Sequence, residues 1–137
     1  MLIIERMTPS PVTITLETTV GQALGIMEER KLRHLPVLDV SEGLVGIVSE
    51  KDLLRANSDD SIKVDMTTEA ITVTEYTTLE EAARIMADQK ISSLPVMRGS
   101  QLVGIITETD LFRVFLELLG AREKGVRLTM LIPEEKG

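Results

Sequence analysis

The sequence predicts a single α/β domain made of two similar halves that share a core around a pseudo-two-fold axis. The main observation is an internal repeat, because Met7 to Arg55 returns as Met66 to Arg113 with nearly half of the aligned positions identical. A repeat period of about 59 residues is too long for a solenoid. Each half is too short to be comfortably stable alone. In both halves the spacing of apolar residues also changes from a strand period to a helix period and back to short strand-like runs.

Composition limits the classes of function. The 137 residues carry a net charge of −7, and the only aromatic residues are Tyr76, Phe112 and Phe115. The core must therefore be aliphatic, and an acidic chain without aromatic platforms is a poor binder of nucleic acid. There is no cysteine, and no apolar run reaches the length needed to span a bilayer. We expect a cytoplasmic protein that acts on neither nucleic acid nor membranes.

The first strand and the first helix of each half follow from periodicity. Apolar residues alternate with threonines over 12–16 and over 71–74, which predicts two short strands. Apolar residues then recur at helical spacing from Val20 and from Leu79, which predicts two amphipathic helices. Each helix is preceded by a threonine with Gln or Glu three residues later, the pattern of a capping box: Thr19 with Gln22, and Thr78 with Glu81.

Two apolar runs follow each helix and predict a β-hairpin. The runs are 35–38 with 44–48 and 94–97 with 102–106, and the turns between them contain glycine. A second helix is expected over 50 to about 56, and its counterpart over 108 to about 119, ending at Gly120. The predicted order in each half is strand, helix, strand, strand, helix.

These elements divide the chain into four segments. We expect a first copy over 1–57, a linker over 58–65, a second copy over 66–120 and a tail over 121–137. Residues 125–132 alternate like one more strand, but the chain offers that strand no partner. The tail is therefore expected to be the start of a further, truncated domain.

The repeated order and three short motifs resemble a known family. Leu35-Pro36-Val37 recurs as Leu94-Pro95-Val96, and the hairpins end in Gly-Ile-Val-Ser-Glu-Lys-Asp and Gly-Ile-Ile-Thr-Glu-Thr-Asp. Together they resemble a cystathionine-β-synthase (CBS) domain pair, or Bateman module, over about residues 1–118. The tail looks like the junction to an ACT domain, as in the acetoin-utilisation family. The resemblance implies a regulatory sensor, expected as a homodimer packed through its amphipathic helices, with adenosine-containing ligands bound between the copies.

The resemblance also implies the residues of two ligand clefts. The cleft that we expect to be the main one would use Thr107, Asp110, Pro11, Val12, Arg33, His34 and Pro36. The second cleft would use Ser49, Asp52, Ala70, Ile71, Ser92, Ser93 and Pro95. A carboxylate can accept hydrogen bonds from both ribose hydroxyls, while Arg33 and His34 suit a phosphate. AMP, ADP or ATP is therefore preferred, with S-adenosylmethionine as a further possible ligand and no required cofactor.

Several of these residues have simpler explanations. Ser49-x-x-Asp52 and Thr107-x-x-Asp110 are also good N-cap sequences, whether or not a ligand binds. The neighbouring pair Arg33 and His34 could be a solvated charge at a helix end followed by an exposed strand residue. Gly46 and Gly104 interrupt apolar strands, which indicates a close approach by a ligand or by a neighbouring segment. The sequence leaves these alternatives open.

Catalysis has little support in the residue inventory. His34 is the only imidazole, cysteine is absent, and no motif provides a metal site or pairs a nucleophile with its base. We therefore expect no metal and no enzyme activity. The alternative to a ligand sensor is a structural dimerisation scaffold that binds no small molecule.

Overall fold

The computed structural model describes residues 1–125. The first half follows the predicted order of elements. It contains β2 (Ile14–Thr15), α1 (Val20–Arg30), β3 (His34–Leu38), β4 (Leu44–Ser49) and α2 (Glu50–Leu53). β2 runs parallel to β3, and β3 pairs antiparallel with β4, so the three strands form one sheet in the order β2-β3-β4.

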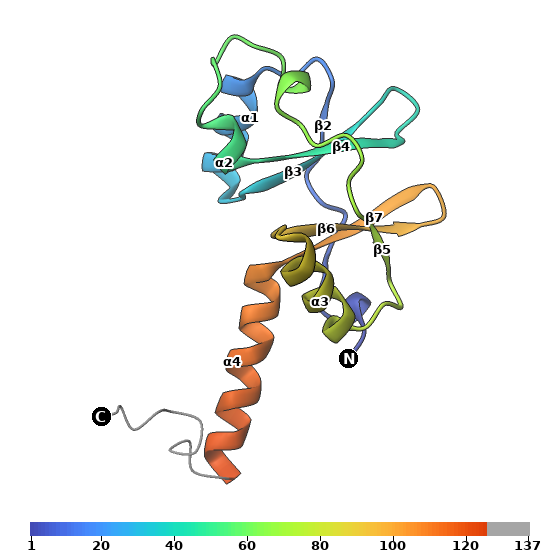
Figure 1. Ribbon diagram of the computed structural model, residues 1–137, viewed down its shortest axis with the longest axis vertical. Coiled ribbons are helices and arrows are strands. Elements are labelled where there is room, and N and C mark those ends of the chain that lie inside the picture. The colour runs from blue at the N-terminus through green and yellow to red at the C-terminus, as the bar shows by residue number, and fades with distance from the viewer. Residues whose placement is uncertain (126–137) are drawn as a thin grey trace, which may run out of the picture.

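The second half repeats this arrangement. It contains β5 (Val73–Thr74), α3 (Leu79–Gln89), β6 (Ser93–Arg98), β7 (Gln101–Thr107) and α4 (Glu108–Gly125). Its sheet has the order β1-β7-β6-β5, where β1 (Thr8–Pro9) comes from the start of the chain. The predicted element order is confirmed in both halves, although β2 and β5 are each only two residues long and so shorter than expected. The two sheets are stacked along the long axis of the molecule (Figure 1).

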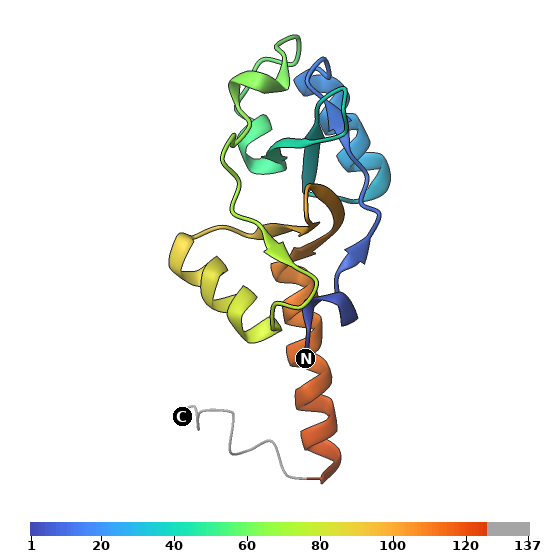
Figure 2. The same ribbon diagram turned by 90° about the vertical axis from the view of Figure 1, so that its right-hand side faces the viewer.

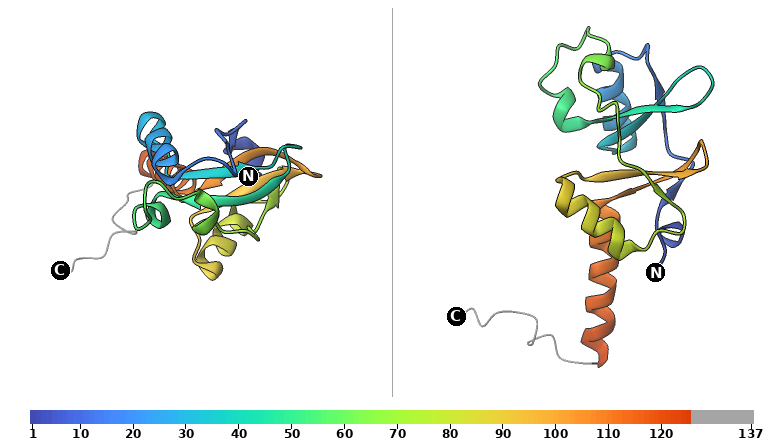
Figure 3. Two further views of the ribbon diagram at one scale, coloured as in Figure 1. Left: turned by 90° about the horizontal axis from the view of Figure 1, so that it is seen from above. Right: turned by 45° about the vertical axis from the view of Figure 1, so that its right-hand side comes forward.

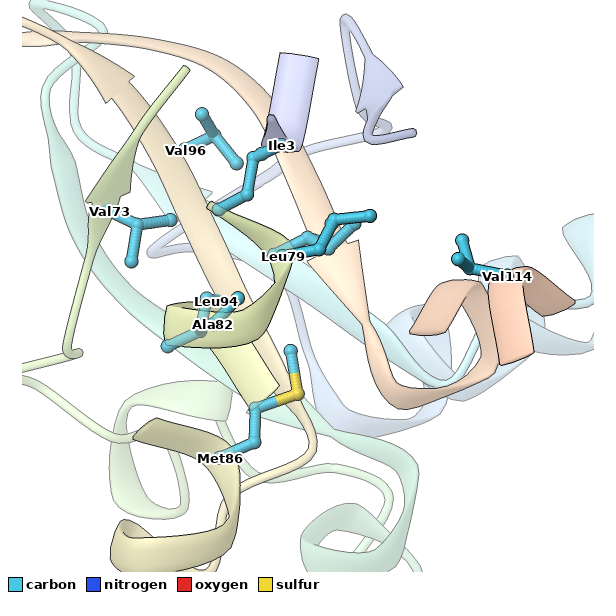
Figure 4. Close-up of a cluster of buried hydrophobic side chains, with 9 residues drawn as sticks. Ile3, Val73, Leu79, Ala82, Met86, Leu94, Val96 and Val114 are labelled. Carbon is cyan, nitrogen blue, oxygen red and sulfur yellow. The ribbon is translucent and has the colours of Figure 1, made fainter. Parts of the chain in front are cut away.

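The start of the chain packs in the second half rather than in the first. Ile3, in the short 3-10 helix η1 (Ile3–Glu5), is fully buried in the hydrophobic core of the second half. Figure 4 shows Ile3 among Val96, Leu79 and other side chains of that core. β1 then pairs antiparallel with β7, with Thr8 opposite Ile105. The first nine residues therefore complete the second half.

The segment between the two repeats makes the reciprocal contact. Ile62, in the 3-10 helix η2 (Ile62–Val64), is fully buried in the core of the first half. Thr67 then bridges to Ile47 of β4 through two backbone hydrogen bonds of 2.9 and 3.0 Å. The two connections run along opposite sides of the molecule (Figure 2). Each half is thus completed by the segment that precedes the other half.

Two repeated methionines explain the glycines inside the apolar strands. A Cβ atom on Gly46 would lie 2.9 Å from the Met66 sulfur and 2.7 Å from the Thr67 carbonyl oxygen. A Cβ atom on Gly104 would overlap the Met7 side chain in the same way. The close approach that the sequence indicated is therefore made by the exchanged segments of the protein itself.

The predicted linker is packed against the first helix. The Val20 N–H donates to the Asp60 carbonyl at 2.8 Å, and the Gly21 N–H donates to the Ser58 carbonyl at 2.9 Å. These bonds satisfy donors that a helix start leaves unpaired. The side chain of Thr19 adds a complete capping box with Gln22.

The second predicted capping box forms only in part. The Thr78 hydroxyl accepts from the Glu81 N–H at 3.0 Å, as expected. The Glu81 carboxylate, however, pairs with Arg84 instead of reaching back to Thr78. The chain start bonds to the next residue of the helix, because the Leu79 N–H donates to the Met1 carbonyl at 2.9 Å.

The last helix differs from the prediction. α4 does not end at Gly120 but continues to Gly125, because a single glycine costs a helix only about 1 kcal/mol. α4 projects away from the two sheets (Figure 3). The strand expected over 125–132 overlaps the end of α4 at Gly125, and the rest of it lies outside the described residues. No helix in the described part of the chain is both long and apolar enough to span a bilayer.

Candidate functional site

The candidate site lies where the open ends of the two hairpins face each other. In the first half His34 begins β3 and lies opposite Ser49, the last residue of β4. In the second half Ser93 begins β6 and lies opposite Thr107, the last residue of β7. α2 and α4 begin immediately after these strands. The hairpin register therefore places hydroxyl groups and helix starts together in both halves.

The two helix starts are capped, as the sequence predicted. The Ser49 hydroxyl accepts from the Asp52 N–H at 3.2 Å, and the Thr107 hydroxyl accepts from the Asp110 N–H at 3.3 Å. The Asp110 carboxylate oxygen Oδ2 also accepts from the Thr107 N–H at 2.9 Å and from its hydroxyl at 3.0 Å. The capping explanation for these motifs is therefore confirmed in both halves.

The two carboxylates differ in how free they are. The side chain of Asp110 is 13% exposed, and its Oδ2 is already engaged by Thr107. The side chain of Asp52 is 39% exposed and accepts a hydrogen bond of 3.3 Å from the exposed Arg55. In Asp110 the oxygen Oδ1 is therefore less occupied than Oδ2. Asp52 is the more accessible acceptor of the two aspartates.

One continuous cleft of about 1410 Å³ joins the two expected clefts. Ser49 and Asp52 line it from the first half, and Thr107 and Asp110 line it from the second. Its lining also includes these other predicted residues: Pro11, Val12, Arg33, His34, Ala70, Ile71, Ser92, Ser93 and Pro95. Pro36 is absent from the lining and is buried within β3 opposite Ile47.

The cleft is less acidic than the protein as a whole. Five carboxylates line it: Glu50, Asp52, Glu69, Glu108 and Asp110. Six cationic side chains line it: Lys31, Arg33, Lys51, Arg55, Lys90 and Arg113. The whole chain has 22 acidic and 15 basic residues. The cleft thus gathers cations in a negatively charged protein, which favours an anionic group there.

Sequence reasoning missed most of these cations. Lys31 and Lys90 are the C-caps of α1 and α3, and both adopt the left-handed conformation that turns the chain into the hairpin. Arg55 and Arg113 stand three residues after the aspartates. Lys31 matches Lys90 in the two repeats, and Arg55 matches Arg113. This identity is the sequence signal that could have pointed to these cations.

A hydrogen bond crosses the cleft between the halves. The His34 ring nitrogen Nε2 lies 2.7 Å from the Ser92 hydroxyl oxygen. Burial lowers the pKa of His34, and the neighbouring Arg33 acts in the same direction. The carboxylate of Glu108 opposes this effect, as do Asp52 and Glu50 more weakly. The ring is therefore neutral at pH 7 when the cleft is empty.

The Ser92–His34 contact corrects one expectation, because it does bring a hydroxyl and a potential base together. A catalytic pair also needs a group that orients the base and donors for the developing negative charge. Among the described residues, the other ring nitrogen, Nδ1, forms no hydrogen bond with a carboxylate. The same part of the chain contains no cluster of three or more potential metal ligands. The pair has the geometry of a structural contact between the halves.

Comparison with protein families identifies the fold. The model of the CBS domain matches twice, over residues 3–59 and 61–117. The chain belongs to the CBS domain family. It is a tandem CBS pair, and both the predicted resemblance and the predicted fold are confirmed.

Curated relatives of this CBS pair include much longer enzymes. Inosine-5′-monophosphate dehydrogenase of Nitrosopumilus maritimus is 34% identical over 106 residues, which cover 77% of this chain. The enzyme of Staphylococcus aureus is 36% identical over 124 residues, which cover 87% of this chain. The CBS pair spans only 22% and 25% of the lengths of these two enzymes.

Solved structures of similar size match almost end to end. AcuB of Vibrio cholerae, described as an acetoin utilization protein, is 33% identical with a TM-score of 0.79, covering 90% of this chain and 96% of its own. The CBS domain pair of protein MJ0100, in complex with 5′-methylthioadenosine and S-adenosyl-L-methionine, is 29% identical with a TM-score of 0.80, covering 84% and 95%. CBSX2 in complex with AMP is 30% identical with a TM-score of 0.75, covering 85% and 97%.

Proposed function

We propose that this CBS pair is a regulatory module that binds an adenosine-containing ligand in the cleft between its two halves. The carrying observation is the cleft itself, which places Ser49 with Asp52 and Thr107 with Asp110 at equivalent positions of one cavity of about 1410 Å³. Ligand pockets usually measure about 300–1,000 Å³. The volume is therefore ample for one nucleotide and supports two half-sites.

AMP, ADP or ATP is the preferred ligand, with S-adenosylmethionine as the alternative. An aspartate at either helix start would accept from the ribose hydroxyls, and Arg33 with His34 would meet the ligand's tail. The six cations that line the cleft support an anionic tail. The complexes of CBSX2 with AMP and of MJ0100 with S-adenosyl-L-methionine support the same ligand class.

Regulation would follow from the position of the ligand between the halves. A ligand that contacts both helix starts can favour one relative orientation of the halves, and it shifts the equilibrium by its difference in affinity for the two orientations. α4 begins at Glu108, which lines the cleft, and projects away from the sheets (Figure 1). The helix would carry the change to an attached domain or to a dimer partner.

A panel of ligands and a pair of variants test the proposal. A ligand at 100 times its dissociation constant should add about 2.7 kcal/mol to the free energy of unfolding, which a thermal-shift assay detects. AMP, ADP, ATP, S-adenosylmethionine and 5′-methylthioadenosine are compared on the unmodified chain, on Asp52→Asn and on Asp110→Asn. Losing one charge-assisted hydrogen bond should weaken the bound compound by about tenfold or more.

The two asparagine variants separate binding from capping. In Asp110→Asn the amide oxygen of the new side chain can still accept from the Thr107 N–H, so the helix start keeps a capping acceptor. A loss of ligand response without a loss of ligand-free stability therefore identifies a ribose contact. No response to any compound from the folded protein would instead favour the scaffold.

The scaffold alternative rests on the exposed side of α4. Four large apolar side chains there are half or more exposed: Phe112, Phe115, Leu116 and Leu118. An amphipathic helix with such an unpaired face is suited to pack against a second copy of the chain. Sedimentation of the ligand-free protein as a dimer, together with no ligand response, would support a dimerisation scaffold.

A further inference from the structure

We propose that a phosphate-bearing ligand enters this cleft together with one proton taken up by His34, so that pH controls the choice between anionic and neutral adenosine compounds. The inference rests on the proposed function and extends it, because it names the residue that selects the ligand class. His34 has no titratable counterpart, since Ser93 occupies the equivalent position of the second half. Only the first half can therefore take up a proton in this way when the ligand binds.

The hydrogen bond across the cleft holds the His34 ring in place. Nε2 lies 2.7 Å from the Ser92 hydroxyl, which can donate to a neutral ring nitrogen or accept from a protonated one. The contact therefore survives the gain of a proton. Nδ1 forms no hydrogen bond with any of the described residues, and the side chain lines the cleft. A protonated ring can thus offer its Nδ1–H to a ligand oxygen.

Charged groups of several elements surround the ring. Burial is the largest influence and lowers the pKa of His34, while Glu108 of α4 raises it, Arg33 lowers it, and Asp52 and Glu50 of α2 raise it. The remaining charged groups of the cleft lining are Lys31, Lys51, Arg55, Glu69, Lys90, Asp110 and Arg113. In the empty cleft the result is a pKa below the ordinary 6.5, and hence a neutral ring at pH 7.

A phosphate group changes this balance. Its negative charge beside the ring favours the imidazolium form, so the pKa of His34 rises when the ligand binds. Coupling is reciprocal, and the phosphate-bearing ligand must therefore bind more tightly as the pH falls between the two pKa values. One linked proton changes the affinity by at most about tenfold per pH unit. A ligand without a charged tail does not raise the pKa of His34 in this way, so its affinity lacks this dependence on pH.

The single histidine makes a direct measurement possible. The C2 proton of His34 is the only imidazole C2 signal in the tag-free chain, so its NMR titration needs no assignment. AMP and 5′-methylthioadenosine serve as probes, because they share the adenosine moiety and differ in the phosphate. We expect AMP to raise the pKa of His34 by about one unit or more, and 5′-methylthioadenosine to leave it unchanged.

Calorimetry on a variant provides the control. Between pH 7 and 8 the phosphate of AMP is almost fully ionised, since its second pKa is about 6. For a rise of one unit, the AMP affinity of the unmodified chain should fall by about twofold over this interval, and by more for a larger rise. His34→Gln should remove that dependence whatever its absolute affinity. The glutamine amide reaches toward Ser92 as the ring does but cannot titrate. If this variant does not fold, the NMR titration of the unmodified chain decides alone.

The outcomes separate the two proposals. AMP binding with an unchanged His34 pKa, or with the same pH dependence in His34→Gln, overturns the inference and leaves the proposed function intact. An equal rise of the pKa with 5′-methylthioadenosine also overturns it. No binding of either compound to the folded chain overturns the inference, and the proposed function falls with it when ADP, ATP and S-adenosylmethionine also fail to bind.

Discussion

Gly46 and Gly104 lie where the halves approach each other most closely. The side chain that covers each glycine is a methionine from the segment that precedes the other half. At Gly104 the obstacle is the flexible Met7 side chain, which can move aside. At Gly46 the nearest atom is the Thr67 backbone oxygen, which accepts the Ile47 N–H. The two positions are equivalent by symmetry but not in how they would respond to substitution.

We expect Gly46→Ala to lower the free energy of unfolding by about 1–3 kcal/mol, as overpacking of a tight contact usually does. Gly104→Ala should cost less, because Met7 can change its rotamer. Urea unfolding followed by circular dichroism measures both. Gly25→Ala is the matched control, since a Cβ there meets nothing within 4 Å inside α1 and should stabilise the helix by about 0.5–1 kcal/mol. Equal costs at Gly46 and Gly104 would contradict this reasoning.

Sequence reasoning at the residue scale found the capping residues, and every predicted site residue except Pro36 lines the cleft. Thr107 and Asp110 form a local pattern that fixes its own geometry, so a few residues of sequence are enough to predict the hydrogen bonds. The Ser92–His34 contact could not be found in this way. It joins positions that are not equivalent in the repeat, and it depends on how two separate hairpins are packed.

At the scale of elements, α4 differs most from its counterpart. α2 has four residues, whereas α4 has 18 and passes through Gly120 without a break. The open surroundings of Gly120 leave room for a side chain. Glycine is therefore a local weakness in α4, and no contact with the described part of the chain requires it there.

We expect Gly120→Ala to increase helix content, because alanine favours a helix interior by about 1 kcal/mol over glycine. The circular dichroism signal at 222 nm and slower amide hydrogen exchange in the last turns would report the change. Gly120→Pro should have the opposite effect and disrupt this part of α4. Unchanged exchange in Gly120→Ala would mean that the helix is limited by another position.

The prediction of elements worked where periodicity was long enough to read. Helices and hairpins repeat their apolar spacing over many residues, and both were predicted in the correct order. η1 and η2 have only three residues each, too few to show a period. The strand partner of Thr8 is Ile105, which lies far along the chain in β7 of the second half. No local pattern could indicate that pairing.

At the scale of the whole molecule, the exchanged segments bind the two halves into one unit. Ile3 is fully buried in the core of the second half, while its neighbour Ile4 is 41% exposed. Arg6 adds an ion pair of 2.7 Å with Glu117 of α4. The start of the chain therefore contacts both the core of the second half and the projecting helix.

Ile3→Ala should lower the free energy of unfolding by about 2–5 kcal/mol, the usual cost of truncating a buried isoleucine. Ile4→Ala is the matched control on the same short helix and should change stability by no more than about 0.5 kcal/mol. Urea unfolding of both variants measures the difference. Similar results for the two variants would show that the chain start is not part of the core in solution.

The exchange of segments also sets an order for synthesis on the ribosome. The first half contains only residues up to about Thr67, so its core can close while the second half is still being translated. Residues 3–9 have to wait, because Thr8 pairs with Ile105 of β7, which is made much later than Thr8. Until then, the apolar side chains of Ile3 and Met7 have no native partner. The nascent chain thus exposes an unpaired apolar segment to chaperones and neighbouring chains until β7 has been made.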